Sequence, residues 1–219
     1  MSKIPFESFF SSPIFRSEKP EWLAKVNKAC DPLIKEVKKN NSIIFKKRDK
    51  IYKVKKGDFA WAHHTGNLIN LKGLEELQKY IGESSFEVLN EMGYDLRRHK
   101  LTFTEFWAQE FSQKGGGHHD AHCHYDNHIS GFYFLKCSPR TSYPVFHDPR
   151  AGKLMAQLPM KNPGEISSGT EAVHVKLKPG TFIIFPAYLT HRFTVDLGID
   201  TFRFIHFNLQ AVRKMSNEK

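Results

Sequence analysis

The stretch GGGHHDAHCHYDNHISGFYFL, residues 115–135, contains five of the chain's twelve histidines and then runs directly into an apolar segment. Histidine is the commonest side-chain ligand for transition metals. A purification tag would lie at a terminus and would not lead into a strand-like run. The stretch therefore indicates either a metal site or a solvated polar loop beside a β-strand, and the rest of the chain has to decide between them.

The C-terminal half of the chain has the pattern of a β fold. From about Leu101 it consists of short aromatic and β-branched segments separated by turn residues, which predict β-strands. Within KLKPGTFIIF (residues 176–185), Pro179 and Gly180 predict a hairpin turn between two apolar strands. Many short strands in succession favour a mainly β fold of the jelly-roll type.

The N-terminal part has helical spacing instead. Apolar residues at helical intervals predict one helix over residues 17–41, capped by Ser17 and interrupted at Pro32. They predict a second helical region over residues 71–94, broken near Gly82. We therefore expect supporting N-terminal helices that pack on the C-terminal β-structure.

Length and composition set the domain organisation. A chain of 219 residues is long enough for one sizeable core, and we expect a single domain over residues 1–219, with helical support over about residues 1–100 and a β core over about residues 101–212. No apolar run approaches the ~20 residues of a membrane helix, so we expect no membrane partner. Three widely spaced cysteines suggest no disulfide framework, which favours a cytoplasmic protein.

Positive charge is concentrated near the N-terminus. The net charge is +10, and residues 1–60 contain fifteen Lys or Arg against seven Asp or Glu, a balance of +8. The densest run is KKRDKIYKVKK, Lys46–Lys56. Such a run more often forms a solubilising surface, but it leaves open an acidic protein or a nucleic acid as a weak partner.

Spacing within the histidine-rich stretch favours the metal site. Residues two apart in a strand face the same side, so His122, His124 and Asp126 would share one face. A third ligand must come from elsewhere, and His191, which directly follows an apolar strand, is the best candidate. Three protein ligands on one side of an ion leave positions open for substrate and oxygen, as in the facial centres of non-haem Fe(II) oxygenases.

Arg203 restricts the kind of ligand that such a metal site could bind. It follows His191 by twelve residues, enough for a strand, a turn and a returning strand that bring it back beside the histidine. Its guanidinium could form a structural ion pair within the sandwich, or it could bind a carboxylate through two parallel hydrogen bonds. A metal together with a carboxylate-binding arginine suits a small diacid that chelates iron at one end, and 2-oxoglutarate has this form.

Four motifs follow one another along the chain: His122-Cys123-His124, then SGFYFL (130–135), PGTFIIFPAYLTH (179–191) and RFIHFN (203–208). In this order they resemble the 2-oxoglutarate/Fe(II)-dependent dioxygenase superfamily, and most closely a group of such oxygenases found in bacteria and marine phages. The resemblance extends over nearly the whole chain, because FFSSPIF (9–15) is similar to the opening of that group.

The resemblance implies a double-stranded β-helix that binds Fe(II) between a strand-borne H-x-[D/E] pair and a distal histidine. Carried over to this chain, His191 is the distal histidine and Arg203 binds 2-oxoglutarate. The pair is His122 with His124, which places a histidine where the acid belongs. Pairing His124 with Asp126 would restore the acid and stays an alternative, although the spacing to SGFYFL favours the first pair.

A tyrosine often lies beside the cosubstrate in this superfamily, at the position of Phe134 in this chain. The neighbouring Tyr133 is the candidate to replace it, but strand alternation turns Tyr133 toward the other face.

The activity that the resemblance implies is a dioxygenase reaction. It would consume 2-oxoglutarate and O2, hydroxylate a C–H bond of an unidentified small molecule or protein side chain, and release succinate and CO2. The histidine at the acid position keeps a different function open, namely a cupin-like metal-binding protein or metalloenzyme that does not use 2-oxoglutarate. Arg203 distinguishes the dioxygenase from the cupin-like function, because the cupin-like function gives this residue no role.

Overall fold

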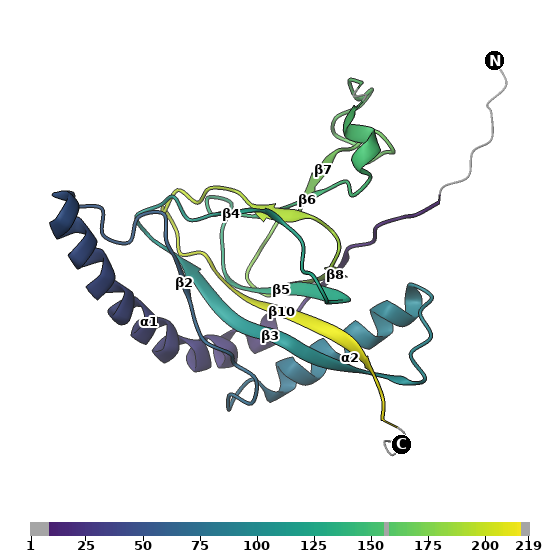
Figure 1. Ribbon diagram of the computed structural model, residues 1–219, viewed down its shortest axis with the longest axis horizontal. Helices are drawn as coiled ribbons and strands as arrows, with labels where there is room; N and C mark the ends of the chain where they lie inside the picture. Colours follow the sequence, from purple (N-terminus) through teal and green to yellow (C-terminus); the bar gives the residue numbers. More distant parts are fainter. Residues whose placement is uncertain (1–8, 156–157, 216–219) are drawn as a thin grey trace.

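The computed structural model describes residues 9–155 and 158–215 of the chain. Two antiparallel sheets face each other (Figure 1). The major sheet has the order β1 (Phe15–Glu18), β8 (Thr181–Pro186), β5 (Ile129–Lys136), β10 (Arg203–Arg213), β3 (His99–Phe111) and β2 (Ala62–His64). The minor sheet has the order β4 (His119–His122), β9 (His191–Phe193), β6 (Pro144–His147) and β7 (Ala172–His174). The prediction of a mainly β, jelly-roll fold is therefore confirmed.

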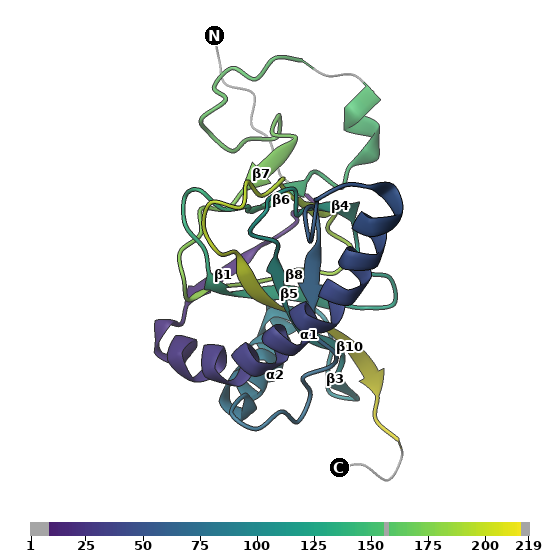
Figure 2. The same cartoon turned by 90° about the vertical axis from the view of Figure 1, so that its left-hand side faces the viewer.

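Two helices, α1 (Leu23–Tyr52) and α2 (Glu75–Glu91), cover the outer face of the major sheet, as Figures 1 and 2 show. Two short 3-10 helices, η1 (Pro20–Trp22) and η2 (Ala151–Met155), complete the described elements. The layer between helices and sheet is an apolar core with members from both sides, including Val26, Cys30, Ile34, Ile81, Leu89, Phe106, Tyr133, Ile205 and Phe207. None of the helices within the described residues is long and apolar enough to cross a membrane.

Both helices differ in detail from the sequence-based expectation. Ser17 lies in β1 rather than at a helix N-cap, and α1 continues without interruption through Pro32. α2 likewise continues through Gly82. Proline and glycine each weaken a helix locally, but in both helices the flanking buried residues pack onto the sheet. Tertiary packing therefore overrides the local preference.

The region before Leu101 is not only helical, because β1 and β2 are the two edge strands of the major sheet. The hairpin expected at Pro179-Gly180 is also different. The turn itself is present, with Gly180 at φ +92° and the amide of Thr181 donating to the carbonyl of Lys178 (3.0 Å). However, the strands on its two sides belong to different sheets, since β7 pairs with β6 while β8 pairs with β5 and β1.

The space between the two sheets is filled mainly by phenylalanine rings. A second apolar core contains Phe111, Phe132, Phe134, Phe146, Ile183, Phe185, Leu189, Phe193, Phe202 and Phe204. The buried polar side chains include His191, His206 and Asn208.

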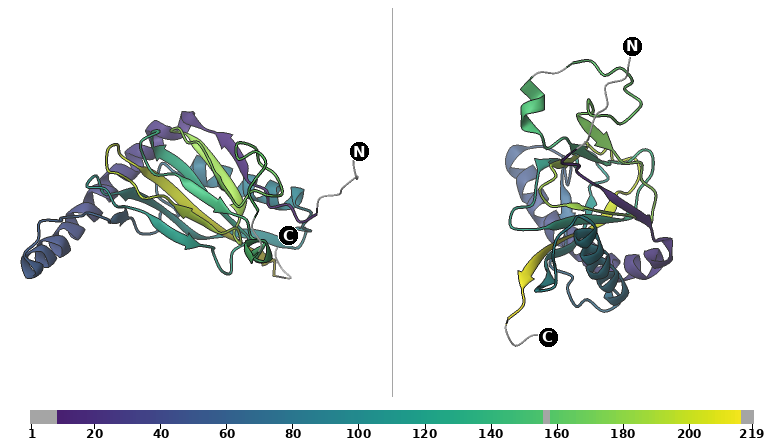
Figure 3. Two further views of the ribbon diagram at one scale, coloured as in Figure 1. Left: turned by 90° about the horizontal axis from the view of Figure 1, so that it is seen from above. Right: turned by 90° about the vertical axis from the view of Figure 1, so that its right-hand side faces the viewer.

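The basic run Lys46–Lys56 forms the C-terminal end of α1 and the segment that follows it. Seen from above, this end of α1 extends beyond the two sheets (Figure 3). Lys46, Lys47 and Lys50 are exposed there.

Candidate functional site

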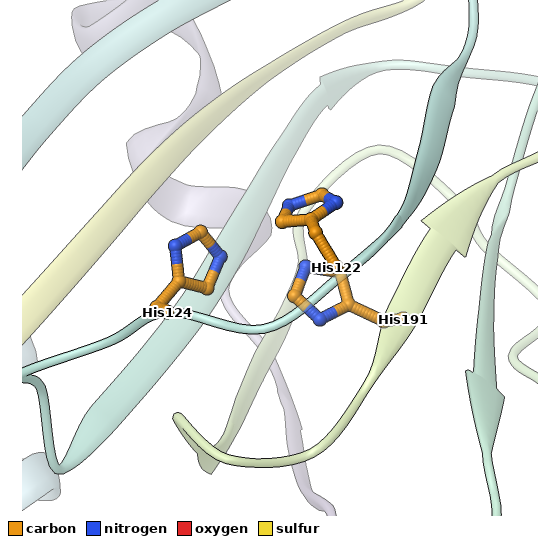
Figure 4. Close-up of side chains that lie close together, drawn as sticks. All are labelled: His122, His124 and His191. Carbon is orange, nitrogen blue, oxygen red and sulfur yellow. The ribbon is translucent and has the colours of Figure 1, made fainter.

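Three of the predicted metal ligands meet between the two sheets (Figure 4). His122 ends β4 and pairs directly with His191 at the start of β9, whereas His124 lies in the connection from β4 to β5. One ring nitrogen from each residue lies within 4.8 Å of those of the other two. The ring centroids are 4.5 Å apart for His122 and His191 and 5.2 Å apart for His124 and His191.

Backbone carbonyls determine how two of these rings are protonated. The Nδ1–H of His122 donates to the carbonyl of Asp120 (2.7 Å), and the Nδ1–H of His191 donates to the carbonyl of Leu189 (3.0 Å). A carbonyl oxygen can only accept, so in the neutral form of each ring the lone pair is on Nε2. Among the described residues, Nε2 of His124 and Nε2 of His191 are buried without a hydrogen-bond partner. Buried unpaired nitrogens that converge on one point are what a bound cation would satisfy.

The protonation state of the cluster also suits a metal. Burial lowers the pKa of His124 to about 3 and that of His191 to about 2, and repulsion from neighbouring histidines contributes in the same direction. Both imidazoles are therefore neutral at pH 7, which is the form that coordinates metal ions.

The structure does not bring Asp126 into this cluster. β4 ends at His122, and Asp126 lies in an exposed turn with a left-handed backbone, at φ +60°. The strand alternation from which a shared face was expected therefore stops before it reaches the aspartate. The set that the described residues bring together is three histidines.

A second group that could hold an ion adjoins the first and shares His124 with it. It consists of His124, Glu105 from β3 and His206 from β10. His206 is 1% exposed, and its Nε2 lies 3.2 Å from Oε2 of Glu105. The amide of Asn208 lies between the members, with Nδ2 at 2.7 Å from Oε2 of Glu105 and 3.0 Å from Nδ1 of His124.

His119 faces the interior as well, although the glycines that precede it in the sequence are typical of a solvated loop. The ring packs against Phe111 and Phe193 inside the barrel, and its Nε2 lies 2.8 Å from Nε2 of Gln109. Burial lowers the pKa of His119 to about 4. The register of β4 shifts between His119 and His122, so both can face inward although they are an odd number of residues apart. Only the glycine-rich lead-in was visible in the sequence, and it suggested the opposite.

Comparison with known families supports what the geometry indicates. Residues 105–203, which include all three histidines, match the family model described as "Putative 2OG-Fe(II) oxygenase". This match confirms the resemblance to the 2-oxoglutarate/Fe(II) oxygenases over residues 105–203. No curated protein matches the chain.

Solved structures of low sequence identity share the fold. A prolyl-4-hydroxylase from Pseudomonas putida has a TM-score of 0.55 at 7% identity, covering 94% of this chain and 95% of its own. A Trichoplax adhaerens prolyl hydroxylase, in complex with a hypoxia inducible factor peptide fragment, has 0.54 at 9% identity and covers 90% and 83%. The alpha-ketoglutarate-dependent epimerase SnoN from nogalamycin biosynthesis has 0.52 at 10% identity and covers 94% and 80%.

Arg203, the residue expected to bind 2-oxoglutarate in such an oxygenase, does not face the three histidines. It points from β10 toward α1 and is 5% exposed. Its Nε–H donates to Oε2 of Glu110 (2.7 Å), and its Nη1 donates to side-chain oxygens of Asn27 (3.2 Å) and Asp31. The structure thus shows the ion pair that was the alternative interpretation of this residue, and it places the guanidinium on the opposite side of the major sheet from the three histidines.

Tyr133, the other residue expected near the cosubstrate, also faces the helices. Its hydroxyl donates to the carbonyl of Lys19 (2.6 Å), and its ring packs against Trp22 and Phe182. The neighbouring Phe132 and Phe134 point into the barrel instead. The alternation noted in the sequence thus holds for this strand.

Proposed function

We propose that this chain is an Fe(II)- and 2-oxoglutarate-dependent dioxygenase that hydroxylates a C–H bond of a small molecule or a protein side chain. The observation that carries the proposal is the convergence of three imidazoles, two of which have a buried Nε2 without a partner. The family match over residues 105–203 supports iron as the ion and 2-oxoglutarate as the cosubstrate.

The chain's own residues would hold the ion on one side. The carbonyls of Asp120 and Leu189 fix the rings of His122 and His191, and Phe185 packs edge-on against His191 at 4.8 Å between ring centroids. This apolar wall excludes water from one side of the centre. Iron, when bound, supplies the coordination positions and redox chemistry for 2-oxoglutarate and O2. The reaction requires no side-chain nucleophile or general base.

We propose hydroxylation as the reaction because two of the structures named above are prolyl hydroxylases. The epimerase with the same fold gives the alternative outcome. Incubation with 2-oxoglutarate, iron and a set of candidate amino acids and peptides, followed by mass spectrometry, distinguishes them. Hydroxylation adds one oxygen atom to the substrate, whereas epimerisation leaves its mass unchanged.

A second candidate function is a cupin-like metal protein that does not use 2-oxoglutarate. Two observations favour it: no carboxylate lies among the three converging ligands, and Arg203 is held by Glu110 and Asp31 on the far face of the sheet. For this reason Arg203 is not part of the proposed cosubstrate site.

Anaerobic titration of metal-stripped protein with Fe(II) and then 2-oxoglutarate tests both functions. We expect the weak visible charge-transfer band of the chelated complex in the wild type and its loss in His122→Ala and His191→Ala. His147→Ala, which removes a histidine of β6 outside the converging set, is the matched control and should keep the band. Iron binding without any band would favour the cupin-like function, and failure to bind iron would refute both.

A further inference from the structure

The three converging histidines differ in what their Nδ1 atoms contact. Nδ1 of His122 and Nδ1 of His191 each face a backbone carbonyl, so both rings present Nε2 to an ion. Nδ1 of His124 faces the side-chain amide of Asn208, at 3.0 Å from Nδ2. An amide can turn either its oxygen or its nitrogen toward a neighbour. The tautomer of His124 therefore depends on a side chain rather than on the backbone.

The contacts of Asn208 select the orientation that opposes metal binding. Its Nδ2 donates to Oε2 of Glu105 (2.7 Å), and Glu105 also accepts from Nε2–H of His206. With Nδ2 toward His124, the proton of that neutral ring must be on Nε2, where it blocks coordination. Oδ1 of Asn208, which is 1% exposed overall, is buried without a partner.

A half-turn of the Asn208 side-chain amide would free Nε2 of His124 for coordination. Oδ1 would then accept the Nδ1–H of His124, and Nε2 of His124 would carry a lone pair like its counterparts in His122 and His191. Metal-bound histidines generally donate their second ring N–H to such an oxygen, which fixes the tautomer and orients the ring. The half-turn gives up the hydrogen bond to Glu105, whose side chain is 47% exposed and can turn to water.

A second metal ion between Glu105, His124 and His206 is a less favourable use of the same atoms. Two divalent ions would bring four positive charges against the single carboxylate of Glu105 and would leave three uncompensated in a half-buried site. The amide of Asn208 already bridges Glu105 and His124 by hydrogen bonds. The space between these groups thus has an occupant that carries no net charge.

We propose that Asn208 is a positioning residue for His124: its amide oxygen accepts the Nδ1–H of His124 in the metal-bound protein, and Glu105 holds the reverse orientation in the metal-free protein. This inference rests on the proposed metal centre, because it assigns a role to a residue behind one of its ligands. Glu105 is not one of the three ligands, but its carboxylate would influence metal binding indirectly, through its hydrogen bond with Asn208.

Co(II) binding to the full-length protein tests the proposal without any turnover assay. Affinity is measured by competition with a chelator, and the visible d–d absorption reports the ligand geometry. Asn208→Leu removes the acceptor, and we expect its Co(II) affinity to fall by roughly 10–100-fold. Gln210→Leu makes a comparable change two residues along β10, opposite Thr102 rather than Glu105, and should bind as the wild type does.

A paired variant separates positioning from mere structural support. In Asn208→Asp with Glu105→Gln, the new carboxylate can only accept from His124, while the new amide can donate to it. We expect this double variant to bind Co(II) at least as tightly as the wild type, although it alters the same buried position as Asn208→Leu. Melting temperatures of the metal-free proteins show whether each variant is folded.

The outcomes distinguish this proposal from the function on which it rests. Equal Co(II) affinity in the wild type and Asn208→Leu overturns the role of Asn208 and leaves the metal centre standing. A loss of affinity in Glu105→Ala with none in His122→Ala would place the ion between Glu105, His124 and His206, and this also overturns the role of Asn208. A wild type that binds no Co(II) refutes the centre and the positioning residue together.

Discussion

Arg203 and His206 lie three residues apart on β10 and point to opposite faces of the major sheet. Arg203 faces α1, where it pairs with Glu110 and Asp31. His206 faces the barrel, where its ring lies 4.7 Å from that of His124 and its Nε2 donates to Glu105. A single strand thus provides both the ionic contact to the helix layer and the polar side chain that lies behind the three histidines.

The first prediction concerns the stability of the Arg203 pair. Glu110 is 4% exposed on its side chain and is bonded to Arg203 and to Lys38. Arg203→Met would leave this carboxylate with one cation, and removal of one partner from a buried pair costs about 3–5 kcal/mol. Because Lys38 remains, we expect the free energy of unfolding to fall by an amount near the lower limit of this range. Chemical denaturation measures this change.

The matched variant for this pair is Arg203→Met with Glu110→Gln, which removes the uncompensated charge and should recover part of the stability. Co(II) affinity should be unchanged in both variants, since neither side chain faces the three histidines. A variant that unfolds no more readily but loses 2-oxoglutarate binding would instead return Arg203 to the cosubstrate site.

Replacement of glycine by alanine should have opposite effects on the stability of the protein at Gly131 and at Gly82. A Cβ at Gly131, in the SGFYFL motif, would lie 2.2 Å from Cζ of Phe207 and 2.5 Å from the carbonyl oxygen of Ile183. The carbonyl belongs to the paired strand β8 and cannot withdraw, so Gly131→Ala should destabilise the protein by about 1–3 kcal/mol. A Cβ at Gly82 meets nothing within 4 Å, and Gly82→Ala in α2 should stabilise it by about 0.5–1 kcal/mol.

Denaturation curves of the two alanine variants, measured side by side, check this pair. Stabilisation by Gly131→Ala would mean that β5, β8 and β10 are farther apart than the structure has them. Destabilisation by Gly82→Ala would mean that the outer face of α2 is covered.

Local pattern was enough to predict the sheet architecture and the histidine cluster. The alternation of side chains along a β-strand placed Tyr133 and Phe134 of SGFYFL on opposite faces, as the structure has them. His191 after an apolar strand was expected to meet His122, and the two pair directly across β4 and β9. These predictions depend on strand periodicity over a few residues, which the sequence encodes locally.

The predictions that failed depend on register and strand partner, which the sequence does not encode locally. Arg203 was expected beside His191 because a turn of suitable length joins them, but β9 and β10 belong to different sheets. The register shift in β4 turns His119 inward, contrary to the glycine-rich context. The contact of Asn208 with His124 becomes visible only once β10 lies beside β3 and the β4–β5 connection.

The exposed basic end of α1 predicts binding to polyanions that weakens with salt. Lys46, Lys47 and Lys50 are exposed on this projecting segment. Contacts to phosphates release counterions, so the logarithm of the binding constant falls with the logarithm of salt concentration by roughly 0.7 per contact for a single strand. Replacing all three lysines by glutamine should lower this slope by about 2, as measured with a fluorescent oligonucleotide. Binding that does not change with salt would contradict an electrostatic surface here.

The buried histidines predict how the stability of the metal-free protein depends on pH. Burial lowers the pKa of His119 to about 4, of His124 to about 3 and of His191 to about 2, whereas an unfolded histidine titrates near 6.5. Below about pH 6.5 the unfolded chain therefore binds protons that the folded chain does not, and the free energy of unfolding falls as the pH falls. Each such group contributes a slope of up to roughly 1.4 kcal/mol per pH unit.

The window between pH 6.5 and 4.5 isolates this effect. The lowered pKa of Glu105, about 2 because of its hydrogen bond with His206, removes stability only below about pH 4.5, where an unfolded glutamate begins to bind protons. Urea denaturation at half-unit intervals in the presence of a chelator measures the slope. We expect His191→Gln to reduce the slope by about one proton equivalent, and Gln210→Leu, which removes no titratable group, to leave it unchanged. A slope that is the same in all three proteins would show that His191 titrates normally in the folded chain.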